Sequence, residues 1–400
     1  MTQTSTVTAA APAPELADAD LETPAFVYDE AVLAAEASAV RAVVAPTGSR
    51  LLLAMKAFSF EHGLRMLAPL LDGLHASSAF EVRLARRVMA DGIVHATVPG
   101  LRDGDVATVA GGSDLLSFNS LGQWQRHRDA VAGLTSPGLR VNPGMSYVED
   151  EHYDPCARNS KLGVPIDDLA TAVARSPSAL RGVEGILVHS NAESTELWQL
   201  ERVVQRLVDR LDTILQQLRW VNLGGGYLLQ DAPDPAALHD AVSLLQSRYG
   251  VEVLFEPGTA LVNRAAMLVA TVVDVVHGGG RAIAVLDTTA NHLPEVLEYR
   301  YTPEVAGEQG CHSYLLGGAS CLVSDHFGIH CFPEPLHVGS RVVITGVGSY
   351  SMVKASWFNG IGLPAVYSRG ADGTLRLRHR YSFEDFVRFH GGDGDANRGA

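Results

Sequence analysis

Short, continuously apolar runs that alternate with helical stretches constrain the fold of this chain more than any other feature. Residues 51–55 (LLLAM) have no polar side chain, which is typical of a parallel strand buried on both faces. Residues 197–218 place leucine, valine or isoleucine at alternating spacings of three and four, the pattern of one apolar helix face. The chain then continues as strand, helix and strand over residues 220–227, 237–249 and 251–255. This alternation predicts parallel strands joined by right-handed crossovers.

The number of such strands predicts a closed barrel in the first two thirds of the chain. Candidate strands lie near residues 51, 73, 93, 114, 139, 183, 220 and 251. Eight parallel strands with intervening helices form a (β/α)8 barrel of about 250 residues, so we predict a TIM-like barrel over residues 23–265. The short strand expected at 24–30 either begins this segment or joins the domain that follows it.

Beyond residue 265 the pattern changes, because strands follow one another through turns without long helices between them. The strands expected here are 267–276, 281–289, 312–318, 341–350 and 374–383. We therefore predict an α/β plus β organisation, with a C-terminal β domain over residues 266–388. Residues 1–22, which contain no Lys or Arg, and the polar residues 389–400 are expected to be disordered tails.

Charge and cysteine content exclude several classes of protein. Lys and Arg number 31 against 45 Asp and Glu, for a formal net charge of -14, so the chain lacks the basic surface that binds nucleic acid or anionic membranes. No apolar run approaches the roughly 20 residues that a membrane-spanning helix needs. The first 22 residues lack the basic start of a signal peptide. The four cysteines form no close CxxC pair, which favours reduced thiols, a cytoplasmic location and no metal site.

A lysine directly follows the first predicted barrel strand. Lys56 comes after residues 51–55, at the C-terminal mouth where barrel enzymes place their chemistry. Its amine can form an imine with an aldehyde cofactor once a partly desolvated pocket lowers its pKa. The alternative interpretation is a surface lysine at the end of a strand.

Three consecutive glycines, Gly224, Gly225 and Gly226 (the glycine triplet), follow the strand at 220–223. Their backbone amides can approach a phosphate because no side chain intervenes, although a plain tight turn is the alternative. Glu256 begins an EPG motif that ends the next strand. A carboxylate that faces a pyridine nitrogen keeps that nitrogen protonated and makes the ring a strong electron sink. An exposed loop acid is the alternative for Glu256.

Two further segments carry candidate site residues. His189 ends the strand at 185–188, where an imidazole can stack on a flat cofactor ring; a structural histidine is the alternative. Cys321 and Asp325 lie in the predicted β domain. By themselves they are consistent with a buried thiol and a turn aspartate.

In their order along the chain, these residues resemble the fold-type III pyridoxal-phosphate decarboxylases, and among them the carboxynorspermidine (carboxyspermidine) decarboxylases. The resemblance extends from about residue 23 to residue 367, and an ordered set is far more specific than any one motif. The matching segments are AMKAF at 54–58, HASSAFE at 75–81, YDPCARNSKLGV at 153–164, His189, GGG at 224–226, EPG at 256–258, GGASCLVSD at 317–325 and GSYSMVKASWFNG at 348–360. It implies an alanine-racemase-like fold and a pyridoxal-phosphate-dependent amino-acid decarboxylase, that is, a carboxy-lyase.

The resemblance also implies roles for individual residues. Lys56 holds pyridoxal 5'-phosphate as a Schiff base, His189 stacks on its ring, and Glu256 pairs with the pyridine nitrogen. The residues that hold the phosphate are Gly224, Gly225, Gly226, Gly258, Thr259 and Tyr350. Cys321 and Asp325 reach the site from the other subunit of an obligate homodimer, and Cys321 protonates the carbanion left after loss of carbon dioxide.

Departures from the family pattern bear on the substrate. The subgroup usually has a histidine two residues before the stacking one and a cysteine three residues after it, where this chain has Leu187 and Ala192. Thr259 stands where ornithine and diaminopimelate decarboxylases have arginine after EPG. The expected substrate is a carboxylated polyamine such as carboxynorspermidine or carboxyspermidine, with a specialised biosynthetic amino acid as the alternative.

One of the acidic residues Asp287, Glu295 and Glu298 is predicted to pair with a distal ammonium group of the substrate; solvated acids on a β-domain loop are the alternative. Two other functions remain open. An amino-acid racemase on the same fold would pair an arginine with the pyridine nitrogen, which Glu256 disfavours. A non-catalytic cofactor-binding protein would resemble the barrel alone, which the predicted β domain disfavours.

Overall fold

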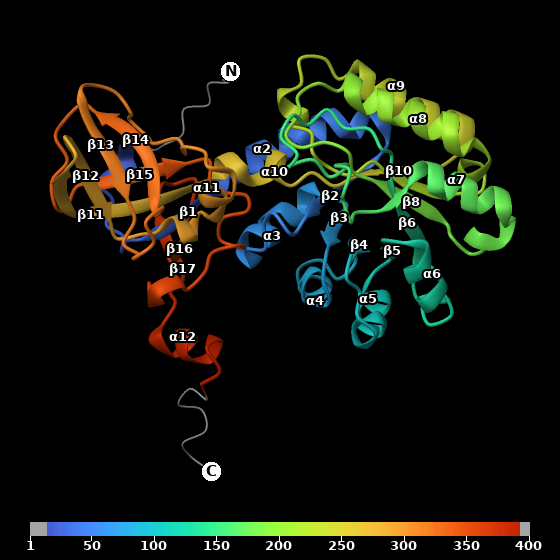
Figure 1. The fold of residues 1–400 in the computed structure, drawn as a ribbon, viewed down its shortest axis with the longest axis horizontal. Coiled ribbons are helices and arrows are strands. Elements are labelled where there is room, and N and C mark those ends of the chain that lie inside the picture. The colour runs from blue at the N-terminus through green and yellow to red at the C-terminus, as the bar shows by residue number, and fades with distance from the viewer. Residues whose placement is uncertain (1–13, 393–400) are drawn as a thin grey trace, which may run out of the picture. The chain divides into compact units, whose positions relative to one another are not determined.

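The computed structural model describes residues 14–392, and the chain divides into two compact units (Figure 1). The barrel unit is Ala34–Leu261. The β unit consists of the described residues up to Leu33 together with those from Val262 onward.

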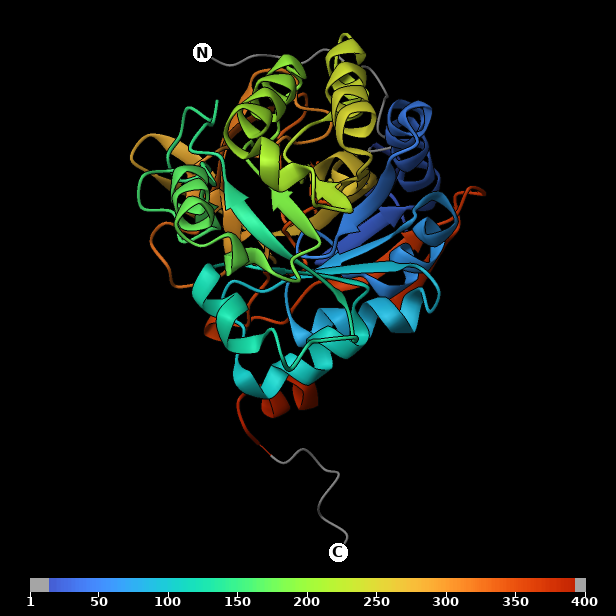
Figure 2. The same cartoon turned by 90° about the vertical axis from the view of Figure 1, so that its right-hand side faces the viewer.

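The barrel unit contains eight parallel strands that close into a ring and are surrounded by helices (Figure 2). In ring order the strands are β2 (Arg50–Ala54), β3 (Gly73–Ala76), β4 (Ile93–Thr97), β5 (Leu115–Phe118), β6 (Ser136–Asn142), β8 (Gly185–Val188), β9 (Trp220–Asn222) and β10 (Glu252–Phe255). Strand β10 pairs with β2 and closes the ring, while the short β7 (Val164–Pro165) pairs with the end of β6. The predicted (β/α)8 barrel is therefore confirmed, with each strand at its predicted place.

Helices connect these strands, and their apolar faces and caps follow from the sequence. The connecting helices are α3 (Glu61–Leu67), α4 (Ala79–Val88), α5 (Val106–Gly112), α6 (Leu121–His127), α7 (Ile166–Arg175), α8 (Trp198–Leu215) and α9 (Ala236–Tyr249). Helix α2 (Glu30–Val44) precedes the first barrel strand, and α10 (Thr259–Val262) follows the last. Helix α8 buries the predicted apolar face, including Leu200, Val204 and Leu207. Ser78 and Ser120 cap α4 and α6, since each side chain accepts a hydrogen bond from a first-turn N–H.

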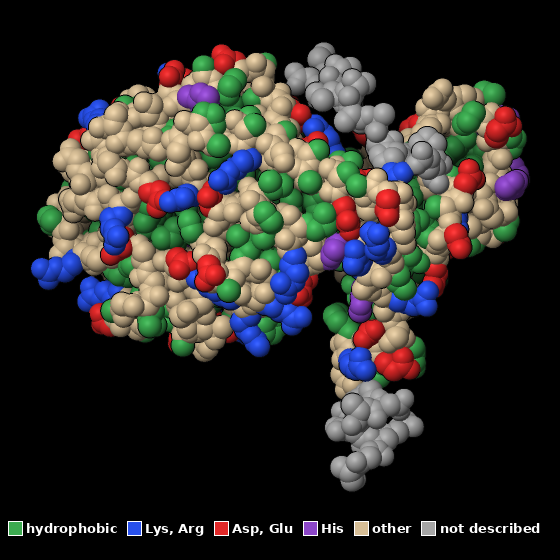
Figure 3. Space-filling model, turned by 180° about the vertical axis from the view of Figure 1, so that it is seen from behind, with side chains coloured by type: hydrophobic (Ala, Val, Ile, Leu, Met, Phe, Trp, Pro, Cys, Tyr) green, Lys and Arg blue, Asp and Glu red, His purple; other side chains and the backbone are tan. Residues whose placement is uncertain are grey.

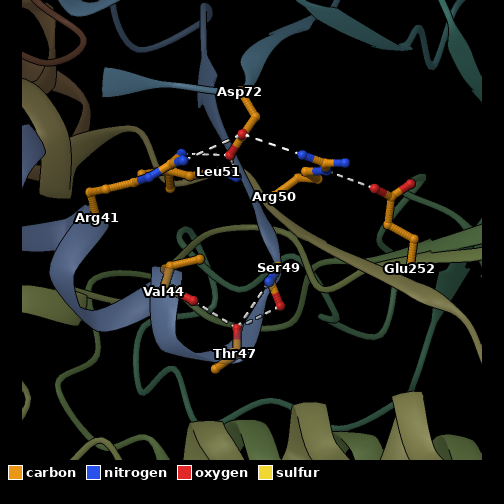
Figure 4. Close-up of polar contacts among 8 residues, drawn as sticks. All are labelled: Arg41, Val44, Thr47, Ser49, Arg50, Leu51, Asp72 and Glu252. Atoms are coloured by element: carbon orange, nitrogen blue, oxygen red, sulfur yellow. Dashed lines mark hydrogen bonds and ion pairs between the residues drawn. The ribbon is translucent and has the colours of Figure 1, made fainter. Parts of the chain in front are cut away.

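Charged side chains join the strands at the N-terminal end of the barrel (Figure 4). Asp72, just before β3, accepts a hydrogen bond from the N–H of Leu51 in β2 over 2.8 Å. Its carboxylate lies between Arg41, at 2.6 Å, and Arg50, at 3.7 Å. Arg50 also pairs with Glu252 of β10 over 2.7 Å. This network ties β10, β2 and β3 together at the barrel end opposite the strand C-termini, where such contacts serve stability.

A tryptophan fills the barrel interior against strands that carry glycine. Trp220 is buried with Leu52 and Leu254, and its Nε1–H donates to Ser136 over 2.9 Å. Gly185, on the neighbouring β8, faces this ring so closely that an added Cβ would lie 2.0 Å from it. The indole ring and a bare backbone therefore occupy the interior together.

The β unit is built on a mixed sheet with the order β14-β13-β12-β11-β1-β16-β17, and β15 pairs with β11. The elements of the unit are β1 (Ala25–Asp29), β11 (Ala266–Gly278), β12 (Arg281–Leu286), α11 (Pro294–Tyr299), β13 (His312–Gly317), β14 (His326–Phe332), β15 (Arg341–Thr345), β16 (Ala365–Arg369), β17 (Leu375–His379) and α12 (Phe383–Phe389). The first strand, β1, lies between β11 and β16, so it belongs to this sheet. Strands β14 and β16 were not predicted, because β14 is interrupted by left-handed Gly328 and β16 is a short run directly after a proline.

The ends of the chain differ in part from the expected tails. Residues 1–13 and 393–400 lie outside the described residues. Residues 14–22 include the one-turn helix α1 (Pro14–Ala17), and Leu16 and Leu21 are buried in a cluster with Val269. These two leucines give the segment apolar surface to bury, although its overall composition is typical of disorder. At the other end, α12 continues to Phe389.

The described surface is mixed in charge. On the face shown in Figure 3, acidic and basic side chains are interspersed. Within residues 14–392, no helix combines the length and the apolar character needed to cross a lipid bilayer.

Gly185→Ala tests the packing of the barrel interior. Its Cβ would overlap the Trp220 ring, and overpacking of this kind typically costs ~1–3 kcal/mol. We expect a lower midpoint of thermal unfolding, measured by circular dichroism. Gly111→Ala is the matched control, because a Cβ at this helical position meets nothing within 4 Å, and its midpoint should stay the same or rise. Equal midpoints for the two variants would contradict the packing argument.

Candidate active site

Four of the predicted site segments meet at the C-terminal ends of barrel strands. Lys56 lies two residues after β2, His189 directly follows β8, the glycine triplet comes after β9, and Glu256 directly follows β10. The carboxyl ends of parallel barrel strands share one mouth. Contacts join these segments: Gly225 N–H donates to His189 Nδ1 over 3.1 Å, and Glu256 N–H donates to the Gly224 carbonyl over 2.8 Å.

Part of the Lys56 side chain is exposed to solvent, while many protein atoms surround its amine. Desolvation lowers the pKa of its amine, and the charge of Arg140 lowers that pKa further. The carboxylates of Glu256 and Glu81 act in the opposite direction without reversing the shift. The amine of Lys56 therefore loses its proton at a lower pH than a surface lysine, which makes it a better nucleophile.

The carboxyl group of Glu256 is buried, with an exposed fraction of 5% for the residue. Burial raises its pKa to about 7, although Lys56, a hydrogen bond from Asn222 and the charge of Arg140 all lower it. That hydrogen bond runs from Asn222 Nδ2 to Glu256 Oε2 over 2.8 Å. A carboxyl group with such a pKa can exchange a proton with a neighbouring group near neutral pH.

The glycine triplet is packed too closely for any side chain. Gly224 and Gly226 have φ angles of 73° and 87°, in the left-handed region that favours glycine. An added Cβ would lie 2.4 Å from the Val188 carbonyl oxygen at Gly224, 2.6 Å from the Glu256 carbonyl oxygen at Gly225, and 2.0 Å from the Asn191 carbonyl oxygen at Gly226. The turn thus lies directly against the ends of β8 and β10.

Two amides of this turn already have partners within the protein. Gly224 N–H donates to Asn222 Oδ1 over 2.7 Å, and Gly225 N–H donates to His189 Nδ1. A phosphate at this turn would meet those two amides already engaged. The expectation that all three glycines hold a phosphate therefore stays a prediction.

Gly258 and Thr259 lead from Glu256 into α10. The Thr259 side chain forms a hydrogen bond with Glu193, whose pKa is raised by burial. Glu193 was not singled out from the sequence, and its φ of 50° is uncommon for a non-glycine residue. Thr259 therefore lies beside a buried carboxyl group.

Several polar residues inside barrel strands were not singled out from the sequence as site residues. They include His75 in β3, His95 in β4 and Arg140 in β6, with exposed fractions of 4%, 0% and 8%. Both ring nitrogens of His75 are buried without a hydrogen-bond partner among the described residues, and Nε2 lies 3.5 Å from Glu256 Oε2. The pKa of His75 is lowered mainly by burial and further by nearby cationic groups, including Lys56. A charged or ionisable side chain among the apolar residues of each strand was the available signal.

In the β unit, Cys321 is exposed, which removes the alternative of a buried thiol. Its N–H donates to Asn359 Oδ1 over 2.8 Å. Asp325 is buried, and its two oxygens accept hydrogen bonds from the N–H groups of Ala290, at 2.7 Å, and Ser320, at 2.9 Å. Asp325 therefore shapes the segment that carries Cys321, and its predicted contact with substrate is not tested by this geometry.

The other acidic residues predicted at the substrate also have partners within the β unit. Asp287 accepts hydrogen bonds from a backbone N–H of β11 and from the Thr23 hydroxyl, at 2.8 and 2.6 Å. Glu295 and Glu298, on α11, both pair with Lys354, whose Nζ lies 3.4 Å from Glu295 Oε1. The Glu295–Glu298 pair thus binds an alkylammonium group of the protein itself, whereas Asp287 supports the sheet.

Tyr350 lies in the segment after β15, with a φ of 53°. The preceding Ser349 donates its hydroxyl to Asn263 Oδ1 over 2.8 Å, and Gly348 N–H donates to the Asn263 carbonyl over 3.0 Å. Left-handed backbone at a tyrosine is strained and is retained where neighbours fix it, often at functional sites. The phosphate contact expected of Tyr350 stays a prediction.

Known proteins resemble this chain over nearly its whole length, although no protein-family model matches it. The chain is 32% identical over 368 residues to the carboxynorspermidine/carboxyspermidine decarboxylase of Herminiimonas arsenicoxydans, covering 92% of this chain and 99% of that protein. It is 33% identical over 374 residues to the carboxyaminopropylagmatine decarboxylase of Synechocystis sp., covering 92% and 95%.

Solved structures resemble it as well. The carboxynorspermidine decarboxylase from Campylobacter jejuni, in complex with norspermidine, has a TM-score of 0.82 at 28% identity and covers 92% of this chain and 100% of that one. The diaminopimelate decarboxylase from Helicobacter pylori, in complex with L-lysine, shares the fold, with a TM-score of 0.80 at 18% identity over 94% and 98%. These likenesses confirm the predicted alanine-racemase-like fold.

Glu256→Gln tests the raised pKa of Glu256 through the pH dependence of stability. The folded protein holds this proton up to a pH of about 7, whereas the unfolded chain releases it near the ordinary value of 4.5. The stability from this proton is complete below pH 4.5 and is lost as the pH rises through about 7. Between those values the wild type, treated with hydroxylamine and dialysed to remove any aldehyde cofactor, should lose up to about 1.4 kcal/mol per pH unit relative to the variant. Parallel pH profiles in urea unfolding would contradict the assignment.

Proposed function

We propose that this chain, which belongs to the family of carboxynorspermidine/carboxyspermidine decarboxylases, releases the α-carboxylate of a carboxylated polyamine as carbon dioxide with pyridoxal phosphate carried on Lys56. One observation carries the proposal. A lysine with a lowered pKa, a buried carboxyl group with a pKa of about 7 and a turn of bare backbone lie at one mouth of the barrel.

The barrel mouth fits pyridoxal phosphate in four respects. The Lys56 amine suits an aldehyde, and the buried carboxyl of Glu256 suits a pyridine nitrogen. The glycine triplet leaves no side chain between its backbone and a phosphate. His75 has two buried ring nitrogens without partners among the described residues, as expected where a polar group binds. We propose His189, Gly258, Thr259 and Tyr350 as further contacts.

When bound, pyridoxal phosphate supplies a ring that accepts the electron pair left behind by carbon dioxide. The chain's own residues control the protons. Glu256 would hold its carboxylate beside the ring nitrogen, where a retained proton would make the ring a stronger acceptor. Lys56 would be the amine that carries the cofactor, and the thiol of Cys321 would give its proton to the substrate Cα once the carboxylate has left.

The substrate class follows from the family and from acidic groups in the β unit. The substrates in the names of the relatives share a carboxylated aminopropyl group. They differ at the distal end, which is an amine or a guanidine. Glu295 and Glu298 already bind the alkylammonium of Lys354, so we propose that this pair attracts the distal cation of the substrate. Leu187 and Ala192 replace the usual histidine and cysteine, and we propose that they alter the choice among carboxylated polyamines.

We further propose a homodimer in which Cys321 and Asp325 serve the partner's barrel. Cys321 is exposed, and Val323, two residues further on, has an exposed fraction of 100%. Asn359 and Asp325 hold this segment in a defined shape through bonds to its backbone. A preformed segment that presents a thiol and an apolar side chain outward is suited to enter another subunit's site, where it would exclude water.

Borohydride labelling tests the central assignment. The purified protein should be yellow, and reduction should fix pyridoxal phosphate to Lys56, as read by peptide mass spectrometry. The other two lysines of the chain, Lys161 and Lys354, are internal controls and should remain unlabelled. Lys56→Ala should lower carbon dioxide release by roughly 1000-fold or more, because it removes a group on which every step depends.

Substrates for that assay are carboxynorspermidine, carboxyspermidine and carboxyaminopropylagmatine, with ornithine and diaminopimelate as controls. At least one carboxylated polyamine should yield stoichiometric carbon dioxide and the matching polyamine. Release from ornithine or diaminopimelate alone, or labelling at Lys161 or Lys354, would overturn the proposal.

Subunit mixing tests the shared site. Lys56→Ala and Cys321→Ala should each abolish most activity as pure homodimers. In a mixed dimer both lesions fall in one site and leave the other site intact, so an equal mixture should recover roughly a quarter of wild-type activity after random exchange. Exchange is verified by native mass spectrometry with one isotope-labelled partner. No recovery despite exchange would place both residues in the site of one subunit.

A further inference from the structure

A chain of buried polar side chains crosses the barrel and ends at Glu256. Its members are Ser117 in β5, His95 in β4 and Asn222 in β9. Together with Glu256 they have exposed fractions of 1%, 0%, 0% and 5%. Such groups are costly to bury unless each hydrogen bond is satisfied, so the directions of their bonds carry information.

The backbone fixes the direction of every bond in this chain. Gly224 N–H can only donate, so the Asn222 atom that it meets at 2.7 Å is the acceptor Oδ1. The other end of the amide, Nδ2, therefore donates to Glu256 Oε2 over 2.8 Å and to His95 Nδ1 over 2.7 Å. His95 Nδ1 must then be unprotonated, and its Nε2–H donates to Ser117 over 2.8 Å.

The other groups near Glu256 make longer contacts with its carboxylate or act through their charge. His75 Nε2 lies 3.5 Å from Oε2 and His95 Nδ1 lies 4.0 Å from it. Lys56 and Arg140 act on Glu256 through their charges. The amide of Asn222 is thus the directional contact, because charges attract a carboxylate without fixing which way it points.

We propose that Asn222, oriented by His95 and Gly224, is a positioning residue that keeps the Glu256 carboxylate ionised and aimed at the ring nitrogen of the cofactor. This inference rests on the proposed function. The same amide also accepts a hydrogen bond from the first glycine of the triplet, so Asn222 fixes the positions of the ring partner and the glycine turn relative to each other.

The physical effect is a competition for one proton. A buried carboxylate and a pyridine nitrogen have similar basicity when burial raises the carboxyl pKa to about 7. A hydrogen bond donated to the ionised form lowers that pKa. Without the Asn222 donor, Glu256 binds the proton more tightly, and the ring nitrogen loses it.

The test is Asn222→Leu, which has similar size and no donor. Wild type and variant are loaded with pyridoxal phosphate labelled with ¹⁵N in the ring, and the ¹⁵N resonance is recorded without substrate. The wild type should show a protonated ring nitrogen and the variant an unprotonated one. Turnover of the variant should be lower by roughly 10- to 100-fold, a usual effect of removing a residue that orients a site group. The midpoint of thermal unfolding verifies folding.

Asn119→Leu is the matched control. Asn119 also accepts from a glycine N–H, that of Gly163, at 2.9 Å and donates to a carbonyl, that of Lys161, at 2.8 Å. Its amide bonds to Gly163 and Lys161 rather than to Glu256, so the ring resonance of the cofactor in this variant should match that in the wild type. A protonated ring in folded Asn222→Leu, or an equal change in both variants, would overturn the inference.

Two measurements keep the inference testable if the leucine variant does not fold. Asn222→Ala removes the donor without adding bulk and should shift the ring resonance in the same direction. In the wild type, ¹⁵N-histidine spectra should show His95 protonated at Nε2; protonation at Nδ1 would overturn the assigned bond directions. A wild type that binds no pyridoxal phosphate would instead refute the proposed function, and the histidine result would still stand by itself.

Discussion

The burial of one carboxyl group, that of Glu256, is the constraint on which the barrel interior depends. A carboxylate removed from water is unstable unless hydrogen bonds and opposite charges surround it. Here Asn222 supplies the bond, and Lys56 and Arg140 supply the charges. These groups come from different barrel strands, and only closure of the ring through the β10–β2 pair brings them to a common mouth. Closure of the ring therefore allows this carboxylate to be buried, because it brings the groups that stabilise the charge close to it.

Close backbone approach is the second requirement, and it fixes geometry where charge alone cannot. Any Cβ added to the glycine triplet would overlap carbonyl groups at the ends of β8 and β10. Two of its amides are turned inward, to Asn222 and His189. The turn therefore connects β9 with both the candidate stacking residue, His189, and the candidate ring partner, Glu256. Substitution here would disturb the two together.

The sequence predicted the framework of the fold and only part of the site, for physical reasons. Buried parallel strands are mainly apolar and alternate with helical stretches, so all eight were visible, and residues at their ends, such as Lys56 and Glu256, were visible with them. His95, Asn222 and Arg140 lie within strands, and the groups that they interact with come from other strands or strand ends, whose positions a single polar residue does not reveal. Likewise, Asp287 and Asp325 in the β unit accept hydrogen bonds from backbone amides, which no side-chain pattern reveals.

The division of the chain into two units separates two chemical tasks. The barrel unit holds an amine, a carboxyl group and a bare turn whose positions depend on one another, so few changes there are tolerable. The β unit holds Cys321 on a segment shaped by its own backbone bonds, and a carboxylate pair on α11 that already accepts an alkylammonium. The partners of Glu295 and Glu298 on α11 thus lie within the β unit, whereas the hydrogen-bond partner of Glu256 lies within the barrel unit. Each unit holds its own polar groups in place through bonds inside that unit.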